Sequence, residues 1–598
     1  MASLFQQTHR PAKITTPLGE NKVLVRSYTG EEHLSGLFHY RIALASEDAQ
    51  LTFSSMVGKS VTLQIPQSSG DIHNINGVVG RFAQSGRDSR LVYYVADIHP
   101  WLWLLTLSAD CKIFQNMSTP DIVKKVFTDL GFSAFKDSLT GTYQPREFCV
   151  QYRETAFAFV SRLMEEEGIF YFFSHDASSH TLVLADDPSS WLTCTGLTAA
   201  RCAGGPDSYE ADDTVTETNF EQAVTPNQYK TDDYNFETPD TDLLATAIGS
   251  ETTRTIYDFP GVFTQQGAGE TIAGNRLSSL ELPGSTVAGT SRCRSFYAGA
   301  KFTLSGHYRP DYNTGYVIQS LRVEGDQVEY SNSFDAFPAT ASYRPRLVTP
   351  RPYIAGSQTA LVVGKSGEEI WTDQYGRIKV KFHWDQSTPK DETSSCWVRV
   401  STPWAGKQWG SIKIPRIGQE VVVSFLEGNP DRPLITGSVY NASQTVPYAL
   451  PDNQTRSTLK SNSSKGGSGF NEIRLEDKAG SEELFIQAQK DMNLIELNDS
   501  TATITKDETI TVKGKRTMTV TGDEAHTNQA NFSLKVSGNL TIEASGSVSI
   551  KAGTTFTNKS GTDMTNDAGT TLTNKAAASQ TVDGGGMLTL KGGMVKIN

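Results

Sequence analysis

A chain of 598 residues is too long for one hydrophobic core, so we expect several domains. Its formal net charge of -12 and its isoelectric point near 5.4 argue against nucleic acid as a main partner. No apolar run reaches the roughly twenty residues that span a bilayer, and the start lacks the apolar core of a signal peptide. We expect a soluble cytoplasmic product with buried free thiols, because its six cysteines form no CxxC pair.

The first third of the chain mixes strand-like runs with two helices. Alternating or dense apolar residues predict strands at 23–28, 38–45, 61–65, 91–98, 169–173 and 316–330. One helix is predicted near 119–130, because Ser118 can cap its start and Gly131 can end it. A second helix is predicted near 155–167, followed by Gly168.

Glu165, Glu166 and Glu167 lie at the end of the second predicted helix. Adjacent residues on a helix face different directions, so the three carboxylates cannot all point into one cleft. We interpret this acidic run as a solvated surface and not as a catalytic cluster.

Three prolines between 345 and 352 predict a linker, and residues 371–441 after it predict a small β-barrel. Five of the eight tryptophans fall in this segment, which contains the strand-like runs 378–384, 396–400, 410–414, 420–425 and 434–439. Five short strands in about seventy residues are typical of an OB barrel. Such barrels often bind single-stranded nucleic acid, but in an acidic chain the tryptophans can equally pack between copies of an oligomer.

His383 lies between two aromatic residues in a predicted strand, where a packed or interface histidine is more typical than a catalytic base. The sequence contains no HExxH or GxSxG motif and no cysteine or histidine cluster at metal-ligand spacing. It therefore predicts no enzyme, no cofactor and no metal site.

The last hundred or so residues, after a Ser/Asn/Gly-rich linker at 442–470, repeat every eight positions. One apolar series is Phe532, Leu540, Val548, Phe556, Met564 and Leu572. A second series, with one polar exception, is Ile486, Leu494, Ala502, Ile510, Met518, His526, Leu534, Ile542 and Ile550. Within one unit, Phe532, Leu534 and Val536 alternate with polar residues, which predicts a strand with one buried face.

Glycines recur at the same interval and predict one corner in each octad. They are Gly514, Gly522, Gly538 and Gly546, then, after a shift of one residue, Gly553, Gly561, Gly569, Gly585 and Gly593. Glycine can adopt the positive φ that a tight corner needs.

A single strand cannot bury its own apolar face, so the octads must stack. One chain could spend three octads on each turn of a three-sided coil, or three chains could each supply one side of every layer. The first arrangement predicts a modulation at 24 residues, which the sequence lacks, so the trimer is favoured. About fourteen octads would then give a prism roughly 65–70 Å long. Its expected core contains Phe532, Leu534, Val536, Leu540, Ile542, Val548, Ile550, Phe556, Met564 and Leu572.

Several long motifs resemble one family. They are YRET at 152–155, RLMEEEGIFY at 162–171, DQYGRIKVKFHWD at 373–385, SCWVRV at 395–400, PRIGQEVVV at 415–423 and EGNPDRP at 427–433. The chain is similar over essentially its whole length to the VgrG spike proteins of bacterial type VI secretion systems. It also resembles the hub and cell-puncturing proteins of contractile phage tails, fused into one polypeptide.

The resemblance implies a mainly β homotrimer with a hub at 1–365, made of two barrel-like subdomains, and an OB-fold neck at 371–441. Residues 471–598 would form a triple-stranded β-helix, the needle. The hub would dock on a tube of Hcp hexamers. A PAAR-type tip protein or effectors would bind the needle's end, where Met594, Val595 and Ile597 lie. The protein would touch a target membrane transiently and be secreted or delivered into the target cell.

Two other functions remain open at this point. A phage-derived spike with a cell-wall hydrolase would need paired carboxylates about 5 to 9.5 Å apart in a groove. A passive trimeric stalk or adhesin would need only the repeat.

Overall fold

The structure is a computed structural model that describes residues 5–197, 199–203, 213–249 and 253–597. Residues 1–4, part of the start inspected for a signal peptide, lie outside the described residues. The chain divides into two compact units, Met1–Asn493 and Leu494–Asn598. No helix in the described ranges has the length and apolar character to cross a membrane.

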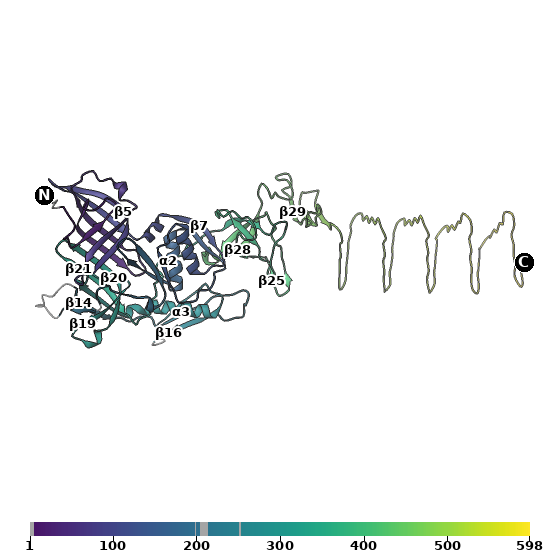
Figure 1. The fold of residues 1–598 in the computed structure, drawn as a ribbon. Helices are drawn as coiled ribbons and strands as arrows, with labels where there is room; N and C mark the ends of the chain where they lie inside the picture. The colour runs from purple at the N-terminus through teal and green to yellow at the C-terminus, as the bar shows by residue number, and fades with distance from the viewer. Residues whose placement is uncertain (1–4, 198, 204–212, 250–252, 598) are drawn as a thin grey trace. The chain divides into compact units, whose positions relative to one another are not determined.

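The largest sheet of the first unit consists of two barrel-like sets of strands joined to each other (Figure 1). The first set, in spatial order, is β1 (Lys13–Thr15), β4 (Ser60–Pro66), β5 (Ile72–Arg87), β6 (Val92–His99), β3 (His39–Ser46) and β2 (Leu24–His33). The second is β20 (Gly315–Asp326), β21 (Tyr330–Pro338), β18 (Ser285–Ser291), β14 (Thr214–Gln222), β13 (Ala199–Cys202) and β19 (Ala300–Ser305). Because β19 also pairs with β20, the second set closes on itself.

The antiparallel β2–β20 ladder connects the two sets, from the Ser27–Asp326 pair to the His33–Ser320 pair. Along β6, alternate side chains are buried, as the period of two in the sequence predicts. The mainly β fold class is confirmed. We call residues 13–338 the barrel region.

Both predicted helices are present, as α1 (Thr119–Asp129) and α2 (Ala156–Glu167). The Ser118 and Thr155 hydroxyls cap them by accepting backbone N–H groups, and Gly168 ends α2 with a φ of 75°. The sequence analysis missed α3 (Gln266–Glu281), which has three glycines and no side-chain cap at its start. Short 3-10 helices are η1 (Phe53–Ser55), η2 (Trp101–Leu107), η3 (Pro188–Ser190), η4 (Leu282–Gly284), η5 (Pro310–Tyr312) and η6 (Leu426–Gly428).

Smaller sheets surround the helices. They comprise β7 (Ala109–Phe114) with β9 (Cys149–Thr155); β8 (Phe135–Ser138), β10 (Phe170–His175) and β11 (His180–Ala185); and β15 (Gln228–Thr231), β16 (Ala245–Ile248) and β17 (Thr255–Asp258). The two-residue strand β12 (Leu192–Thr193) pairs with β19.

The OB-type sheet has five strands, but not the five that the sequence predicts. Its order is β23 (Lys379–Phe382), β22 (Gln358–Val363), β27 (Glu420–Phe425), β28 (Pro433–Val439) and β24 (Arg399–Val400). Strand β22 lies ahead of the predicted boundary at 371, so this domain begins earlier. Residues 411–414 of the predicted strand at 410–414 form no strand, and Gly410 ends a short hairpin of β25 (Ala405–Gly406) and β26 (Trp409–Gly410). Sequence patterns do not report which distant strands pair, which explains both errors.

The predicted linker at 442–470 and the predicted start of the needle at 471 also differ from the structure. Strand β29 (Arg456–Lys460) lies inside the linker and pairs with β30 (Glu472–Glu476), which pairs with β31 (Glu483–Gln487). Residues 471–493 therefore belong to the first unit.

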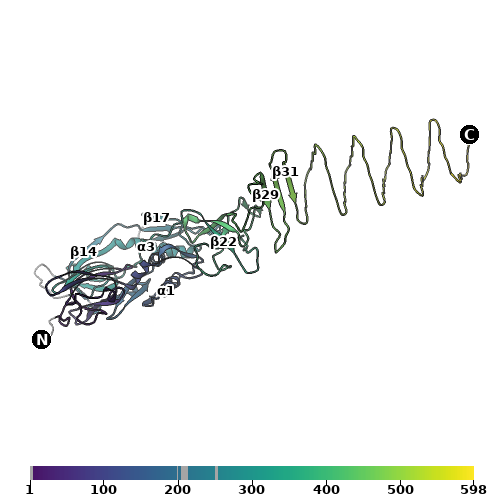
Figure 2. The same cartoon turned by 90° about the horizontal axis from the view of Figure 1, so that it is seen from above.

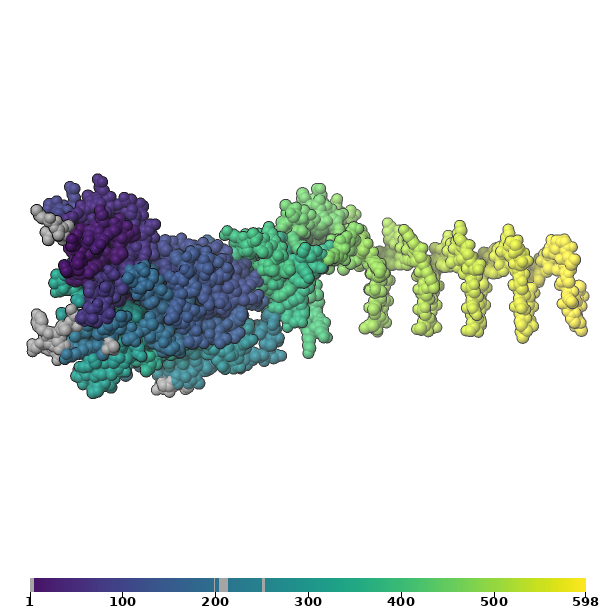
Figure 3. All heavy atoms as spheres, viewed as in Figure 1, coloured from purple at the N-terminus to yellow at the C-terminus, as the bar shows by residue number. Residues whose placement is uncertain are grey.

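The second unit consists of extended segments separated by two-residue bends that recur every eight residues, for example at 529–530, 537–538 and 545–546. Figures 1 and 2 show its regular turns from two directions. In the space-filling view, successive turns stand apart with open space between them (Figure 3).

Buried histidines lie in the core of the barrel region. The backbone N–H of Trp101 donates to Nε2 of His180 over 2.8 Å, and Nδ1 of His180 lies 2.8 Å from Oδ1 of Asn76. Each ring nitrogen of the neutral His180 side chain therefore has a hydrogen-bond partner. Burial lowers the pKa of His73 and of His180 to about 4.

We expect the unfolding temperature of the barrel region to fall as the pH drops from 6.5 towards 4. A histidine with a lowered pKa stabilises the fold fully above its unfolded pKa, and this contribution is lost as the unfolded chain takes up protons. Calorimetry over this range should show a shallower fall for His180→Gln, and an unchanged one for His9→Gln at an exposed site. An equally steep fall in His180→Gln would contradict this account.

Candidate assembly interface

The six extended residues between two bends divide into two faces. We define the second, fourth and sixth residues after a bend as inner positions, and the first, third and fifth as outer positions. In the octad after the bend at 529–530, Phe532, Leu534 and Val536 are inner, whereas Asn531 and Lys535 are outer. All ten core residues predicted from the sequence fall at inner positions.

These ten apolar side chains are 43–71% exposed in the single chain. A continuous apolar face of this kind marks a contact surface. The rings of His526 and Phe532 lie 5.9 Å apart between centroids, although a bend separates the two residues. Inner positions of consecutive octads therefore share one side of the chain.

The backbone of the second unit is almost free of internal hydrogen bonds. Among residues 494–597, the one backbone–backbone bond runs from the Met587 N–H to the Gly584 carbonyl, at 3.0 Å. Each extended segment thus presents free N–H and C=O groups on both edges, which other strands can pair with. A coil in which successive turns of one chain pair with one another is not what the structure contains.

The corner glycines lie at the bends, but most of them do not adopt the positive φ that was expected of them. Gly514, Gly522, Gly538, Gly546, Gly561 and Gly569 all occupy bend positions. Between 494 and 597, however, Gly585 is the single residue with a positive φ, 58°. The shift of the glycine series at Gly553 does not change the spacing of the bends. Up to Gly546 the glycine is the second residue of its bend, and from Gly553 on it is the first. A Cβ added at these six glycines meets nothing within 4 Å.

The interpretation of Glu165, Glu166 and Glu167 as a solvated surface is wrong. Glu165 is buried, and Glu166, with 11% of its side chain exposed, forms ion pairs with Arg146 at 2.8 Å and Arg351 at 2.6 Å. Arg146 also pairs with Glu167 at 2.7 Å. Glu165 accepts hydrogen bonds from the backbone N–H groups of residues 348 and 349, at 3.0 and 2.9 Å. Together the three carboxylates hold the 348–351 segment and Arg146 against α2.

The same region attaches the OB domain to the barrel region. The Val150 N–H donates to Asp431 over 2.7 Å, and Arg432 pairs with Asp233 at 2.9 Å. Val150 also packs in one hydrophobic cluster with OB core residues such as Val380. We call the α2 glutamates with Arg146, Arg351 and Asp431 the clamp. Two of the motifs that carry the family resemblance, at 162–171 and 427–433, build it.

The pKa values of two clamp carboxyl groups shift in opposite directions. Burial alone would raise the pKa of Glu166, but Arg146, Arg351 and Arg162 lower it well below its usual range. In Asp431, burial raises the pKa despite the opposing effect of Arg162. Arg162 itself is buried and paired with Glu154 at 2.8 Å.

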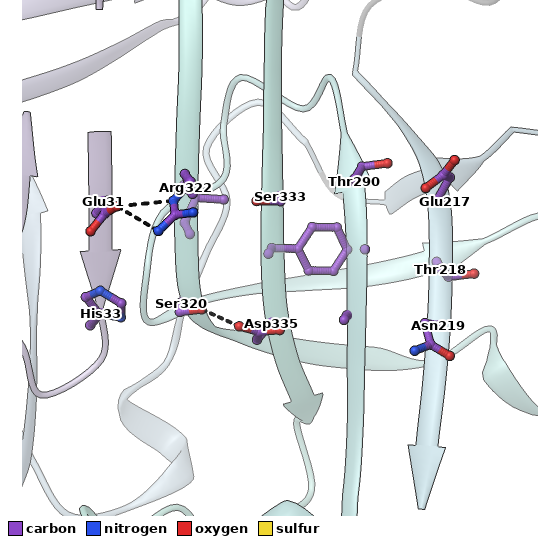
Figure 4. Close-up of a pocket in the computed structure, with 14 residues that line it drawn as sticks. Glu31, His33, Glu217, Thr218, Asn219, Thr290, Ser320, Arg322, Ser333 and Asp335 are labelled. Carbon is purple, nitrogen blue, oxygen red and sulfur yellow. Dashed lines mark hydrogen bonds and ion pairs between the residues drawn. The ribbon is translucent and has the colours of Figure 1, made fainter. Parts of the chain in front are cut away.

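A polar groove of about 810 Å³ lies on the sheet where β2, β20, β21, β18 and β14 run side by side (Figure 4). Glu31 pairs with Arg322 at 2.8 Å, and Asp335 accepts from the Ser320 hydroxyl at 2.7 Å. The third carboxylate, Glu217, lies across the groove in Figure 4. Two of the three carboxylates are already engaged, and the groove does not present the free pair that a glycan hydrolase uses.

Other predicted sites lie as follows. His383 is exposed, with Nε2 3.1 Å from the Thr359 hydroxyl. Met594, Val595 and Ile597 are exposed. All six cysteines are free; four are buried, whereas the remaining two, Cys111 and Cys202, are half-buried. Within the described ranges, no group of three or more His, Cys, Asp or Glu side chains could hold a metal ion.

Comparison with known families accounts for three parts of the chain. Residues 31–329 match the phage tail baseplate hub (GPD) family. Residues 362–440 match the type VI secretion system/phage-baseplate injector OB domain, and residues 457–568 match the bacteriophage T4 gp5 C-terminal trimerisation domain.

Individual proteins extend these matches. The type VI secretion system spike protein VgrG1b of Pseudomonas aeruginosa is 43% identical over 519 residues, which cover 83% of this chain and 70% of that protein. The E. coli c3393 protein, a component of the type VI secretion system, has a similar fold with a TM-score of 0.54 at 24% identity, over 71% of this chain and all of that one. VgrG in the Francisella PdpA–VgrG complex gives a TM-score of 0.51 at 10% identity, over 78% and 84%.

We expect Glu166→Gln to lower the free energy of unfolding of the first unit by about 3 kcal/mol, because it leaves the buried Arg162 and the half-buried Arg146 and Arg351 short of an anion. Since the arginines lower the pKa of Glu166, its contribution is complete above about pH 4.5 and is lost at lower pH. The control Arg322→Ala breaks an exposed pair, 74% and 51% accessible, and should cost less than about 1 kcal/mol. Equal losses in chemical denaturation would contradict the clamp.

Proposed function

The chain belongs to the VgrG family of type VI secretion system spike proteins, and from this premise we propose how it acts. It is a trimeric puncturing spike that carries effectors. Three copies bring their octads together, so that each supplies one side of every layer of the needle. The observation that carries this mechanism is the inner face of the second unit, which is apolar, exposed and bordered by unpaired backbone.

In the proposed trimer, the ten inner residues from Phe532 to Leu572 form the needle core. Burying one such side chain contributes about 1.5–3 kcal/mol, and every layer buries three copies of it. The backbone N–H and C=O groups of each octad form hydrogen bonds with octads of the other chains in the layers above and below. Force along the axis then acts on many hydrogen bonds at once, and no strand can peel away alone.

We further propose that the hub, within residues 1–365, docks on a tube of Hcp hexamers. The exposed Met594, Val595 and Ile597 would contact a PAAR-type tip protein or effectors. The Francisella VgrG solved together with PdpA supports the idea that such a spike binds another protein. The protein is cytoplasmic before firing and is then delivered with the tube through the target membrane.

The proposed action is mechanical and needs no catalysis by this chain. Its relative VgrG1b is named a spike protein, and two of the three carboxylates of the polar groove are engaged by Arg322 and Ser320. A cell-wall hydrolase is therefore not favoured. A passive stalk is not favoured either, because the hub and injector families match the first unit.

We expect Leu540→Asp to reduce Hcp export into the medium at least tenfold, to the level of a gene deletion. Three aspartates would lie at one level of the core without partners, each costing several kcal/mol. The control Thr541→Asp changes the neighbouring outer position and should leave export within twofold of wild type. Quantifying Hcp in the medium tests this expectation. Export by the deletion strain would instead point to a passive stalk, and full export by Leu540→Asp would contradict the core assignment.

A further inference from the structure

Three consecutive octads near the start of the second unit carry charges at the inner position that is apolar further along. Glu508, Arg516 and Glu524 are each the second residue after a bend. The equivalent residues of the later octads are Phe532, Leu540, Val548, Phe556, Met564 and Leu572. The charges therefore lie on the side of the chain that the core occupies.

None of these three side chains forms an ion pair within the part of the chain that the structure describes, and all three are exposed. A charge at an inner position of an assembled prism leaves water, and it then needs a partner of opposite sign. The single chain supplies no such partner.

A trimer with threefold symmetry supplies these partners of opposite charge. In a prism with one octad per side, a chain moves to the next side after each octad, and a neighbouring chain's next octad stacks directly above the first. On every side, Glu508 of one chain thus lies below Arg516 of a second chain, which lies below Glu524 of the third. The layers are about 4.8 Å apart, which is within reach of these side chains.

We propose that Glu508, Arg516 and Glu524 form an ion ladder between the three chains that fixes their register. The inference rests on the trimeric prism of the proposed function. The apolar octads cannot fix register by themselves, since a shift by eight residues replaces one apolar inner residue by another. Single polar or charged core positions are a known means of specifying register in coiled assemblies.

The ladder discriminates against a shifted chain through like charges. When one chain slips by one octad, its Arg516 stacks against Arg516 of a neighbour, and Glu508 stacks against Glu524. In the aligned trimer, the contacts between successive layers join opposite charges, whereas the three like charges of one layer lie on different sides of the prism. The last octad of the ladder is polar at all three inner positions, because His526 and Asn528 follow Glu524 in it.

Disulfide cross-linking of the full-length chain tests the register. Thr541 is at an outer position. In aligned trimers the three copies of residue 541 lie on different sides of the prism, so cysteines at this position point away from one another and cannot form a disulfide. In a slipped trimer two copies lie one layer apart on the same side, within the Cα separation of about 4.4–6.8 Å that a disulfide spans.

We expect Thr541→Cys to give no additional covalent dimer when the ladder is intact. Combined with Glu508→Leu, Arg516→Leu and Glu524→Leu, it should give at least ten times more dimer, in a protein that still sediments as a trimer. The ladder variant without Thr541→Cys corrects for cross-links through Cys111 and Cys202. Trimers of the combined variant that do not cross-link would overturn the proposal. Cross-linking with the ladder intact would instead contradict the aligned prism itself.

A second variant tests the ion ladder if the three leucine substitutions prevent trimers from forming. The reversed chain, Glu508→Arg, Arg516→Glu and Glu524→Arg, keeps opposite charges in contact within its own trimers. Co-expressed with the wild type under a different tag, it should enter mixed trimers at less than a tenth of the random share. Mixing at the random share would overturn the ladder.

Discussion

The constraint on which the rest depends is that a lone β-strand satisfies neither its backbone nor its apolar face. In the second unit, 104 residues from Leu494 to Ile597 form one internal backbone hydrogen bond and expose their apolar inner side chains. Such a chain is stable only when other strands flank it. Copies of the same chain meet the requirement at every layer, because the octads are equivalent. Stiffness then follows from the same contacts that make the needle fold.

A stiff needle is useful only if force reaches it through the first unit, and the clamp explains how the barrel region and the OB domain move together. The α2 glutamates hold the 345–351 segment and Arg146, while Asp431 and Arg432 fasten the OB domain to the barrel region. These contacts are charged, hydrogen-bonded and at least half-buried, so removing one partner leaves its counterpart unsatisfied. The motifs at 162–171 and 427–433 thus have a mechanical role within this unit.

What the sequence predicts well is local. The two capped helices, five of the twelve barrel strands, and the eight-residue spacing of bends depend on neighbours along the chain, and the family resemblance was confirmed. What it missed depends on distant partners. Strand β22 joins the OB-type sheet through strands that follow it, and Glu166 is largely shielded from solvent because Arg351, far along the chain, lies against it. Positive φ does not explain the corner glycines, since most bends of the second unit form without it.

Hydrogen exchange of the backbone amides between residues 494 and 597, measured on the purified full-length trimer, tests the central claim most directly. If strands of three chains pair in every layer, amides at the middle of the octads should exchange at least about a hundredfold more slowly than in an unfolded chain. Exchange at unfolded rates throughout this segment, in a protein that sediments as an intact trimer, would contradict the account.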